Sequence, residues 1–364
     1  MNDDAADPKR GDRSAPTGGG RPTLRQVADL AGVSPSTVSL VLQNKGNLPD
    51  ETRAKVQVAA ERAGYRRPAA RRTETPGGKV MPVGVIADDI QNPYYAELYN
   101  AIDTAPAPSG RLPLLASSHG SIERQVSLLR GLWEMGCAGV LLIPANGSGQ
   151  ETLDVIRELH IPVVLGVRHL GFGTFDYVGP NYFLGMQMAT NHLLDLGHRR
   201  IAFVGGEAAN SAYSERLGGF RMSLSAAAGL RPEAIEIAGP PNGDFGAQAM
   251  ADLLARPDPP TAVIAYNDQL AFGLMSGARE AGLVPGRDIA IVGFDDIRAS
   301  ALRNVPLTTV STPPSRIGEE MWRLLEARIA DPDADPVNII PPPVLKVRKS
   351  CGPPAVDADG TARA

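Results

Sequence analysis

The chain has 364 residues, which suggests two or three domains, and its 43% hydrophobic and 21% charged residues are the balance of a globular protein rather than of a disordered chain. The longest apolar runs fall far short of the roughly 20 residues that span a bilayer, and the acidic N-terminus lacks the apolar segment of a secretory signal. Two cysteines, Cys137 and Cys351, cannot supply a disulfide framework or a four-ligand zinc site, so we expect a reduced, cytoplasmic protein.

The net charge of −4 is divided unevenly along the chain. Residues 21–79 carry +6, whereas residues 1–20 carry −1 and the residues from 80 onward carry −9. This asymmetry is expected when one segment of a chain contacts a polyanion and the rest does not. A solvated charged surface would give the same asymmetry. Charge alone therefore does not distinguish this surface from a polyanion-binding segment, and sequence motifs are needed to do so.

Residues 1–20 are polar and end in three glycines, which predicts a disordered tail. The pattern that follows predicts two short helices joined by a tight turn. Thr23 suits the N-cap of the first helix, and Gly32 ends it where a left-handed residue is needed. Ser34 then caps the second helix, with Pro35 at its first position. A third helix follows residues 49–50 and ends at Gly64.

The second of these helices has an inward and an outward face. Val38 and Leu42 are expected to face inward, and the outward residues are Pro35, Ser36, Ser39 and Leu40. Two helices across a tight turn place the second in the major groove of DNA. A generic three-helix cap would show a similar pattern, but the basic excess favours DNA binding.

Beyond a Gly/Pro-rich linker, short apolar runs alternate with helix-length amphipathic segments. The predicted strands are Val83–Ala87, Leu112–Ala116, Gly139–Ile143, Val163–Val167, Ile201–Val204, Ile235–Ala238, Ala262–Ala265 and Ile289–Val292. The predicted helices are Ser121–Met135, Gln150–Leu159, Asn181–Leu196, Ser214–Ala228, Gly246–Ala255 and Asp268–Ala281. This alternation predicts parallel sheets covered on both faces, and because the series restarts at Ile201 we expect two similar α/β lobes. Ligands of such folds bind at the carboxyl ends of the strands.

Several motifs together resemble one family. The segment Thr23–Leu42, with Thr52-Arg53 and Gly64-Tyr65, is similar to the helix-turn-helix of the LacI/GalR family of bacterial transcriptional regulators. Further motifs follow in the family's order: Asn92-Pro93-Tyr94-Tyr95, Gly197-His198-Arg199-Arg200-Ile201, Arg216-Leu217-Gly218-Gly219-Phe220, Asn267-Asp268, Gly293-Phe294-Asp295-Asp296 and Pro306-Leu307-Thr308-Thr309-Val310. The resemblance covers about residues 21–350. It implies a homodimeric DNA-binding repressor whose core resembles the periplasmic sugar-binding fold and senses a small effector.

The expected fold is α/β, with an N-terminal all-α helix-turn-helix domain and a two-lobed, periplasmic-binding-protein-like core with parallel sheets. The expected parts are a tail (1–20), the helix-turn-helix domain (21–66), a hinge or linker (67–80), the effector-binding core (81–350) and a second disordered tail (351–364). Within the core, the N-lobe comprises about residues 81–180 and 311–325, and the C-lobe about residues 181–310 and 326–350.

The resemblance assigns the outward residues Pro35, Ser36, Ser39 and Leu40 to the DNA groove. The candidate phosphate contacts are Thr23, Ser34, Thr37, Gln43, Asn44, Thr52 and Tyr65, whose hydroxyl and amide groups suit positioning on the backbone. Leu40 departs from the polar residue often found there. Because leucine cannot make the bidentate contact to guanine, we expect weak readout of G at that base.

The linker departs from the family's hinge-helix pattern, Tyr-x-Pro-Asn-x-x-Ala-Arg-x-Leu. Proline comes one place late, at Pro68, and Glu74 stands at the leucine position, where a carboxylate cannot act as an apolar wedge in the minor groove. The linker contains four arginines, Arg66, Arg67, Arg71 and Arg72. They could instead contact phosphates or a narrow minor groove, and the alternative is a basic linker that is only solvated.

In the resembled family, matching positions line the cleft between the lobes and bind a sugar-like effector. The candidates here are Asn92, Tyr94, Tyr95, Arg168, Arg216, Phe245, Asn267, Asp268 and Asp295. Arginine and aspartate suit this role because their charge-assisted hydrogen bonds are directional.

Alternatives remain for some of these residues. Asp268 could cap the helix that follows, Asp295 could cap a turn, and adjacent Tyr94 and Tyr95 are not expected to face the cleft together. Gly166 stands where an aspartate is common. Arg168, two places later, would favour an anionic group on the effector, with an exposed surface arginine as the alternative.

The sequence has no phosphate-binding glycine loop, no nucleophile elbow and no metal-ligand spacing among its five histidines, so we expect no enzyme, no metal and no cofactor. A solute-binding protein of a transporter would share the fold but needs export, and a sugar kinase or dehydrogenase would need a glycine loop. The expected partners are double-stranded operator DNA, a small sugar-like effector and a second copy of the chain, with no membrane.

Overall fold

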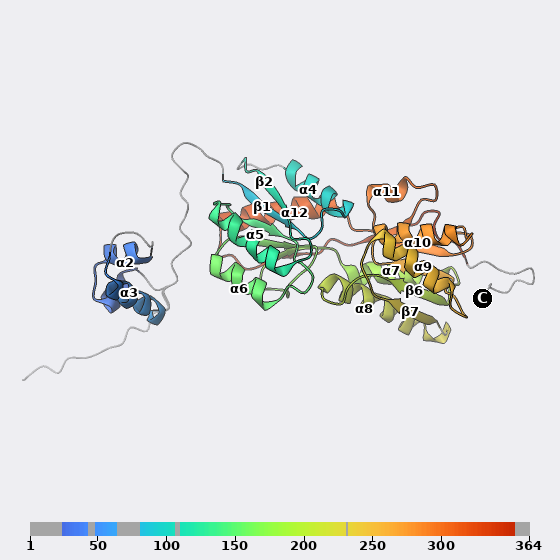
Figure 1. Cartoon of the computed structure of the whole chain (residues 1–364), viewed down its shortest axis with the longest axis horizontal. Helices are drawn as coiled ribbons and strands as arrows, with labels where there is room; N and C mark the ends of the chain where they lie inside the picture. The colour runs from blue at the N-terminus through green and yellow to red at the C-terminus, as the bar shows by residue number, and fades with distance from the viewer. Residues whose placement is uncertain (1–23, 43–47, 64–80, 106–109, 231, 354–364) are drawn as a thin grey trace, which may run out of the picture. The chain divides into compact units, whose positions relative to one another are not determined.

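The computed structural model describes residues 24–42, 48–63, 81–105, 110–230 and 232–353 (Figure 1). The chain separates into two compact units, Met1–Gly78 and Lys79–Ala364, which are described in turn.

The first unit contains three helices, α1 (Leu24–Ala31), α2 (Pro35–Leu42) and α3 (Asp50–Arg62). Its core is built by one fully buried valine from each helix, Val27, Val38 and Val56. Gly32 takes the left-handed conformation (φ +66°) between α1 and α2, and the Ser34 hydroxyl accepts a hydrogen bond from the Thr37 N–H at 3.1 Å. The turn and the cap predicted for this segment are therefore confirmed.

The second unit begins with a sheet of six parallel strands in the order β11-β5-β4-β3-β1-β2. The strands are β1 (Val83–Ala87), β2 (Pro113–Ser117), β3 (Val140–Leu142), β4 (Val163–Gly166), β5 (Asp176–Val178) and β11 (Asn338–Ile339). Alternate residues of β1 enter different cores: Val83 and Val85 pack with α4 (Pro93–Thr104) and α12 (Pro314–Ala330), whereas Ile86 packs with α5 (Ile122–Glu134) and α6 (Gln150–Leu159). Helices thus cover both faces of this sheet, as the continuous apolar strands predicted.

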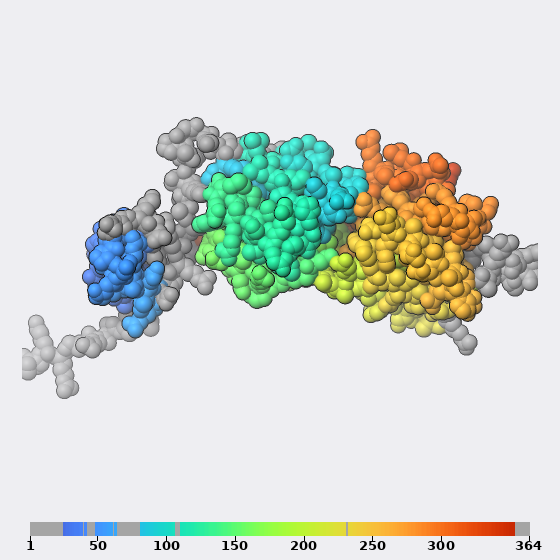
Figure 2. All heavy atoms as spheres, in the orientation of Figure 1, coloured from blue at the N-terminus to red at the C-terminus, as the bar shows by residue number. Residues whose placement is uncertain are grey.

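A second six-stranded sheet has the order β12-β10-β9-β8-β6-β7. Its strands are β6 (Arg200–Val204), β7 (Glu233–Ile237), β8 (Ala262–Ala265), β9 (Ala290–Asp295), β10 (Thr308–Ser311) and β12 (Val344–Lys346), of which β12 runs antiparallel to β10. Its helices are α7 (Tyr182–Asp195), α8 (Ser211–Ala226), α9 (Gly243–Leu254), α10 (Asp268–Glu280) and the short α11 (Arg298–Ala301), with a 3₁₀ turn at Ala228–Leu230. The predicted restart near Ile201 is therefore the start of a second sheet. Figure 2 shows the two lobes of this unit meeting, the first in cyan and green and the second in yellow and orange.

The chain passes between the two sheets three times: after β5, after β10 and after β11. We expected all of residues 326–350 in the second lobe, and the structure corrects this. Asn338 and Ile339 pair with Tyr177 and Val178, because β5 leaves an open edge on the first sheet. Only β12 then returns to the second sheet.

Candidate functional site

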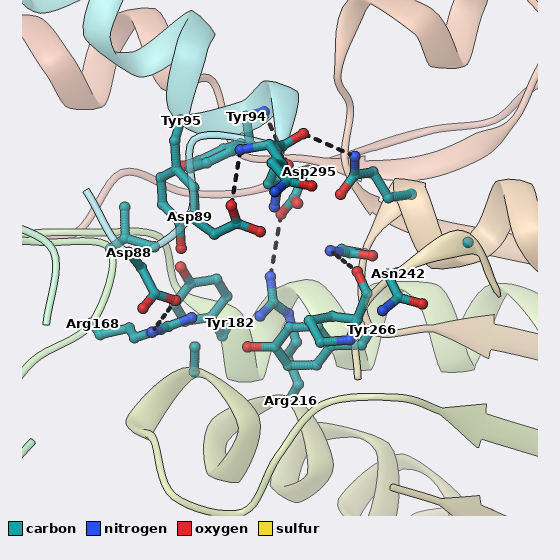
Figure 3. Close-up of a pocket in the computed structure, with 18 residues that line it drawn as sticks. Asp88, Asp89, Tyr94, Tyr95, Arg168, Tyr182, Arg216, Asn242, Tyr266 and Asp295 are labelled. Atoms are coloured by element: carbon teal, nitrogen blue, oxygen red, sulfur yellow. Dashed lines mark hydrogen bonds and ion pairs between the residues drawn. The ribbon is translucent and has the colours of Figure 1, made fainter. Parts of the chain in front are cut away.

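A cavity of about 280 Å³ lies between the two lobes of the second unit, at the carboxyl ends of strands from both sheets (Figure 3). Seven of the nine predicted effector residues line it: Asn92, Tyr94, Tyr95, Arg168, Arg216, Asn267 and Asp295. Further polar or aromatic wall residues, which the sequence analysis missed, are Asp88, Asp89, Gln91, Tyr182, Asn242, Tyr266 and Gln269. The remaining wall is formed by Val167, Ala212, Pro241 and Gly243.

Tyr94 and Tyr95 both line the cavity, which corrects the expectation that they could not face it together. They stand in the first turn of α4, behind the Asn92 cap, whose side chain accepts a hydrogen bond from the Tyr94 N–H at 3.0 Å. The two rings meet edge to face, with centroids 5.7 Å apart. Adjacent residues can share one cavity here because α4 begins at its wall. Burial raises the pKa of both phenols, so they stay neutral hydrogen-bonding groups at physiological pH.

Arg216 and Asp295 form a buried ion pair within the second lobe, with 3.2 Å between Nη2 and Oδ1 (Figure 3). Three aromatic rings surround the guanidinium at 4.2 Å from Cζ to each centroid: Tyr182, Tyr266 and Phe294. Burial raises the pKa of the Asp295 carboxyl to about 8, against the opposing effect of Arg216. This packing fixes the direction of the arginine before any ligand arrives.

Asp295 and Asp296 both adopt positive φ angles, +112° and +57°, which are unfavourable for residues with a side chain. Arg216 holds the first, and Arg348 holds the second through a 2.6 Å contact. Strained residues held in place by their surroundings gather at functional sites. Asp295 is therefore a wall residue as predicted, and it also forms the turn that ends β9.

Arg168 is buried, which excludes the exposed arginine considered as the alternative. Its Nη1 donates to Asp88 Oδ2 at 2.8 Å and to the Pro144 carbonyl at 2.9 Å. The preceding Val167 has a φ of +65°, an unusual value for a β-branched residue, and the Arg168 N–H donates to the Gly166 carbonyl at 2.5 Å. A strained tight turn thus directs this side chain toward Asp88.

Three buried polar atoms of wall residues have no hydrogen-bond partner among the described residues. They are Asp88 Oδ1, an acceptor, Arg216 Nε, a donor, and the Tyr94 hydroxyl, which can be either. Buried polar groups are almost always paired, because an unmade hydrogen bond costs about 1–3 kcal/mol. These atoms therefore mark positions where a polar ligand would bond.

Asp268 and Phe245 do not line the cavity, contrary to the prediction. Asp268 is fully buried, and its carboxylate accepts hydrogen bonds from the Ile297 N–H and the hydroxyls of Ser300 and Thr309. It does not cap α10 either, because Asn267 does so by accepting from the Leu270 N–H. The Phe245 ring packs on Gly239, where an added Cβ would lie 2.1 Å from it.

A simple signal could have found some of the missed residues. Asp88 and Asp89 directly follow the predicted strand Val83–Ala87, and Tyr266 directly follows Ala262–Ala265. Polar or aromatic residues at those places lie at the carboxyl ends of strands, where ligands bind. Tyr182 gave no such signal, because it does not directly follow a predicted strand but begins α7 after the chain has passed from the first sheet to the second.

In the first unit most of the described candidates lie at the start of α2, whereas Leu40 lies in its last turn and Thr52 lies in α3. Ser34, Pro35, Ser36 and Leu40 are exposed, and Thr37 and Thr52 are partly buried. The Ser34 hydroxyl also contacts the hydroxyls of Ser36 and Thr37, at 2.7 and 2.8 Å. Some candidates lie outside the described residues: Thr23, Gln43, Asn44, Tyr65, Arg71 and the side chain of Ser39.

A three-helix unit whose second helix has one exposed side, and an α/β unit with a polar interlobe cavity, together define a ligand-responsive DNA-binding regulator. Known proteins agree with this class. Residues 23–68 match the model for bacterial regulatory proteins of the lacI family, and residues 190–351 match a periplasmic binding protein-like domain. The ribose operon repressor of Escherichia coli is 30% identical over 329 residues, which cover 90% of this chain and 99% of that protein.

Two solved structures extend the comparison. A transcriptional regulator CelR–cellobiose complex is 31% identical and has a TM-score of 0.68, covering 91% of this chain and 100% of that one. A LacI-family regulator from Enterococcus faecium with bound ribose is 28% identical, with a TM-score of 0.68 over 75% of this chain and 99% of its own. The chain belongs to the LacI family of bacterial regulatory proteins. It is a DNA-binding transcriptional regulator of the repressor type and not an enzyme. No helix in the described part of the chain is long and apolar enough to cross a membrane.

Proposed function

We propose that this regulator works in the cytoplasm as a homodimer that represses transcription from a palindromic operator, and that a small sugar-like effector in the interlobe cavity controls its affinity for DNA. The observation that carries the proposal is the pair of sites on one chain: an exposed α2 with a capped N-terminus, and a buried cavity lined by polar and aromatic groups. Two-fold symmetry of the dimer would match the symmetry of the operator.

For DNA, α2 would enter the major groove with Pro35, Ser36, Ser39 and Leu40 toward the bases. Exposed Leu40 would contact a base only by packing, for instance on a thymine methyl group. The candidate phosphate contacts remain Thr23, Ser34, Thr37, Gln43, Asn44, Thr52 and Tyr65, with Arg71 in the linker. Within this proposal residues 21–66 form the DNA-binding domain, residues 67–80 the hinge and residues 81–350 the core.

For the effector, we infer a small polar molecule with several hydroxyl groups. The cavity of about 280 Å³ lies just below the roughly 300–1,000 Å³ typical of small-molecule sites, so a single sugar ring suits it. Tyrosine rings offer apolar faces for stacking, while carboxylates, amides and guanidinium groups bond hydroxyls. The solved relatives that contain ribose and cellobiose support this class.

The cavity can transmit a signal because hydrogen bonds between the lobes flank it. On one side Gln269 donates to the Gln91 carbonyl at 3.2 Å and the Arg298 N–H donates to Glu97 at 3.0 Å. On the other side Asn146 donates to Glu207 at 2.7 Å, and His169 lies 2.9 Å from Glu215. An effector between the lobes would change how they close and so shift the DNA-binding equilibrium. Such coupling is typically about 1–3 kcal/mol, or about 5- to 150-fold in affinity.

The test is selection of bound sites from random DNA, followed by titration of the selected duplex with and without ribose, glucose or cellobiose. We expect a palindromic site, dimeric stoichiometry and at least a fivefold change in DNA affinity with one sugar. Because coupling is reciprocal, the duplex should change that sugar's affinity by the same factor. A protein that binds sugar but selects no DNA would instead support the solute-binding alternative.

A further inference from the structure

We propose that the Asp88–Arg168 ion pair determines effector specificity by binding two neighbouring hydroxyl groups of a neutral effector and rejecting anionic ones. The inference rests on the proposed sugar-like effector and deepens it. It also reverses the expectation that Arg168 favours an anionic group.

The first observation is charge neutralisation. Arg168 Nη1 lies 2.8 Å from Asp88 Oδ2, and both side chains are buried, so little solvent screens the pair. The arginine therefore offers no free positive charge. The cavity wall contains three carboxyl groups, Asp88, Asp89 and Asp295, against two guanidinium groups, Arg168 and Arg216. An anionic substituent beside Arg168 would lose its hydration and meet no uncompensated cation there, because Asp88 already pairs with this guanidinium.

The second observation is the free acceptor. Asp88 uses Oδ2 for the ion pair, while its buried Oδ1 has no hydrogen-bond partner in the described part of the chain. Both contacts that the Arg168 side chain makes to polar atoms of the described residues come from Nη1. The pair thus places an acceptor beside a guanidinium with further donor groups. A hydroxyl both donates and accepts, so two neighbouring hydroxyls match this arrangement: one donates to Oδ1 and the other accepts from the guanidinium.

The third observation is that the pair is rigidly held. Pro144 fixes the guanidinium through its carbonyl, and the strained turn at Val167 fixes the direction of the side chain. At Gly166 a Cβ would lie 2.3 Å from Met321 Cε, so an acidic side chain there would require Met321 to move. With glycine at position 166, the carboxylate beside Arg168 is supplied by Asp88, which follows β1, and Arg168 is its counter-charge.

The test uses the full-length protein and two sets of probes, the neutral sugars ribose, glucose and cellobiose and the anions gluconate, glucuronate and ribose 5-phosphate. Calorimetric titration should show binding of at least one neutral sugar and at least tenfold weaker binding of every anion. Asp88→Asn removes the counter-charge of Arg168, so neutral-sugar affinity should fall at least tenfold and an anion should gain. The exposed Asp154→Asn, which makes the same charge change away from the cavity, should alter neither.

Two further measurements keep the inference open to refutation if Asp88→Asn folds poorly. The double variant Asp88→Asn/Arg168→Gln has no buried unpaired charge, and it should lose the neutral sugar without gaining an anion. Monodeoxy analogues of the bound sugar should bind the native protein tenfold or more weakly at two adjacent positions, and the losses should shrink in the double variant. Equal binding of anions by the native protein, or unchanged selectivity in both variants, would overturn the inference while leaving a sugar effector intact. Failure of all six probes to bind would instead refute the sugar effector itself.

Discussion

Asp268 offers a sharp test, because the sequence predicted a ligand contact and the structure shows a structural role. Replacing it with alanine leaves three buried donors without their acceptor: the Ile297 N–H and the hydroxyls of Ser300 and Thr309. These groups hold the start of α11 and the middle of β10 against α10. The variant should therefore lose stability in the second lobe.

The magnitude follows from the bonds. A hydrogen bond to a charged group contributes about 1.5–3 kcal/mol, so three give an upper bound of about 9 kcal/mol. Removing a fully buried carboxylate, whose pKa burial raises to about 7, recovers part of its desolvation cost. We expect a net loss of about 3–5 kcal/mol in the free energy of unfolding. Asp268→Asn keeps one oxygen for Ile297 and Ser300, and Thr309 can turn to accept from the amide, so about 1 kcal/mol is expected.

Urea unfolding followed by far-UV circular dichroism measures the loss. Tryptophan fluorescence would miss it, because Trp133 and Trp322 both belong to helices of the first sheet. An alanine variant within about 1 kcal/mol of the native protein would refute the structural role. So would an asparagine variant that is fully stable but binds the effector tenfold more weakly, since that pattern belongs to a residue that contacts the ligand.

Further predictions concern both sites. Ser34→Ala removes the cap of α2, so the first unit should lose about 1 kcal/mol and gel shifts should show weaker DNA binding. Arg216→Lys replaces the planar guanidinium, which lies among three aromatic rings, with an ammonium group that is not planar. Calorimetry should therefore show at least a tenfold loss of effector affinity with the fold intact. Leu40→Arg should shift the selected operator toward G at one base pair, and an unchanged site would count against groove contact by Leu40. Burial raises the pKa of Asp295 from its ordinary value of 3.8 to about 8 in the folded state. Between these two pH values the folded state keeps a proton that the unfolded state has released. Stability should fall as pH rises through that window, and Asp295→Asn should flatten the slope of urea midpoints against pH.

The sequence predicted most of the long elements, but it missed α12 (Pro314–Ala330), the longest helix among the described residues. The strands Val83–Ala87 and Ala262–Ala265 and the helix Gln150–Leu159 have the predicted bounds, because continuous apolar runs and amphipathic periods are local signals. Four strands were missed: β5, β10, β11 and β12. Each has two to four residues and pairs with a partner distant in sequence or across a passage between the lobes, so its pattern is too short to stand out.

The sequence predicted the location of the cavity more reliably than the side chains that line it. Arg216 and Asp295 were expected in the cavity and lie there, because both belong to ordered family motifs. Asn267 and Asp268 are neighbours, yet only the first lines the cavity, since the cap geometry of α10 turns the second into the core. The partner of Arg168 could not be predicted, because Asp88 is 80 residues away and the turn at Val167 brings them together.

The three passages of the chain between the sheets bear on how the molecule is made. The first sheet begins at β1 but gains its outer strand only with Asn338 and Ile339, and the second gains β12 at Val344–Lys346. The fully buried Ser350 then bonds to Thr308 and Ile291. Neither lobe can be completed during synthesis until almost the whole chain has left the ribosome. A premature stop near residue 335 would therefore leave both lobes unfinished, and neither lobe can be obtained intact as one continuous fragment.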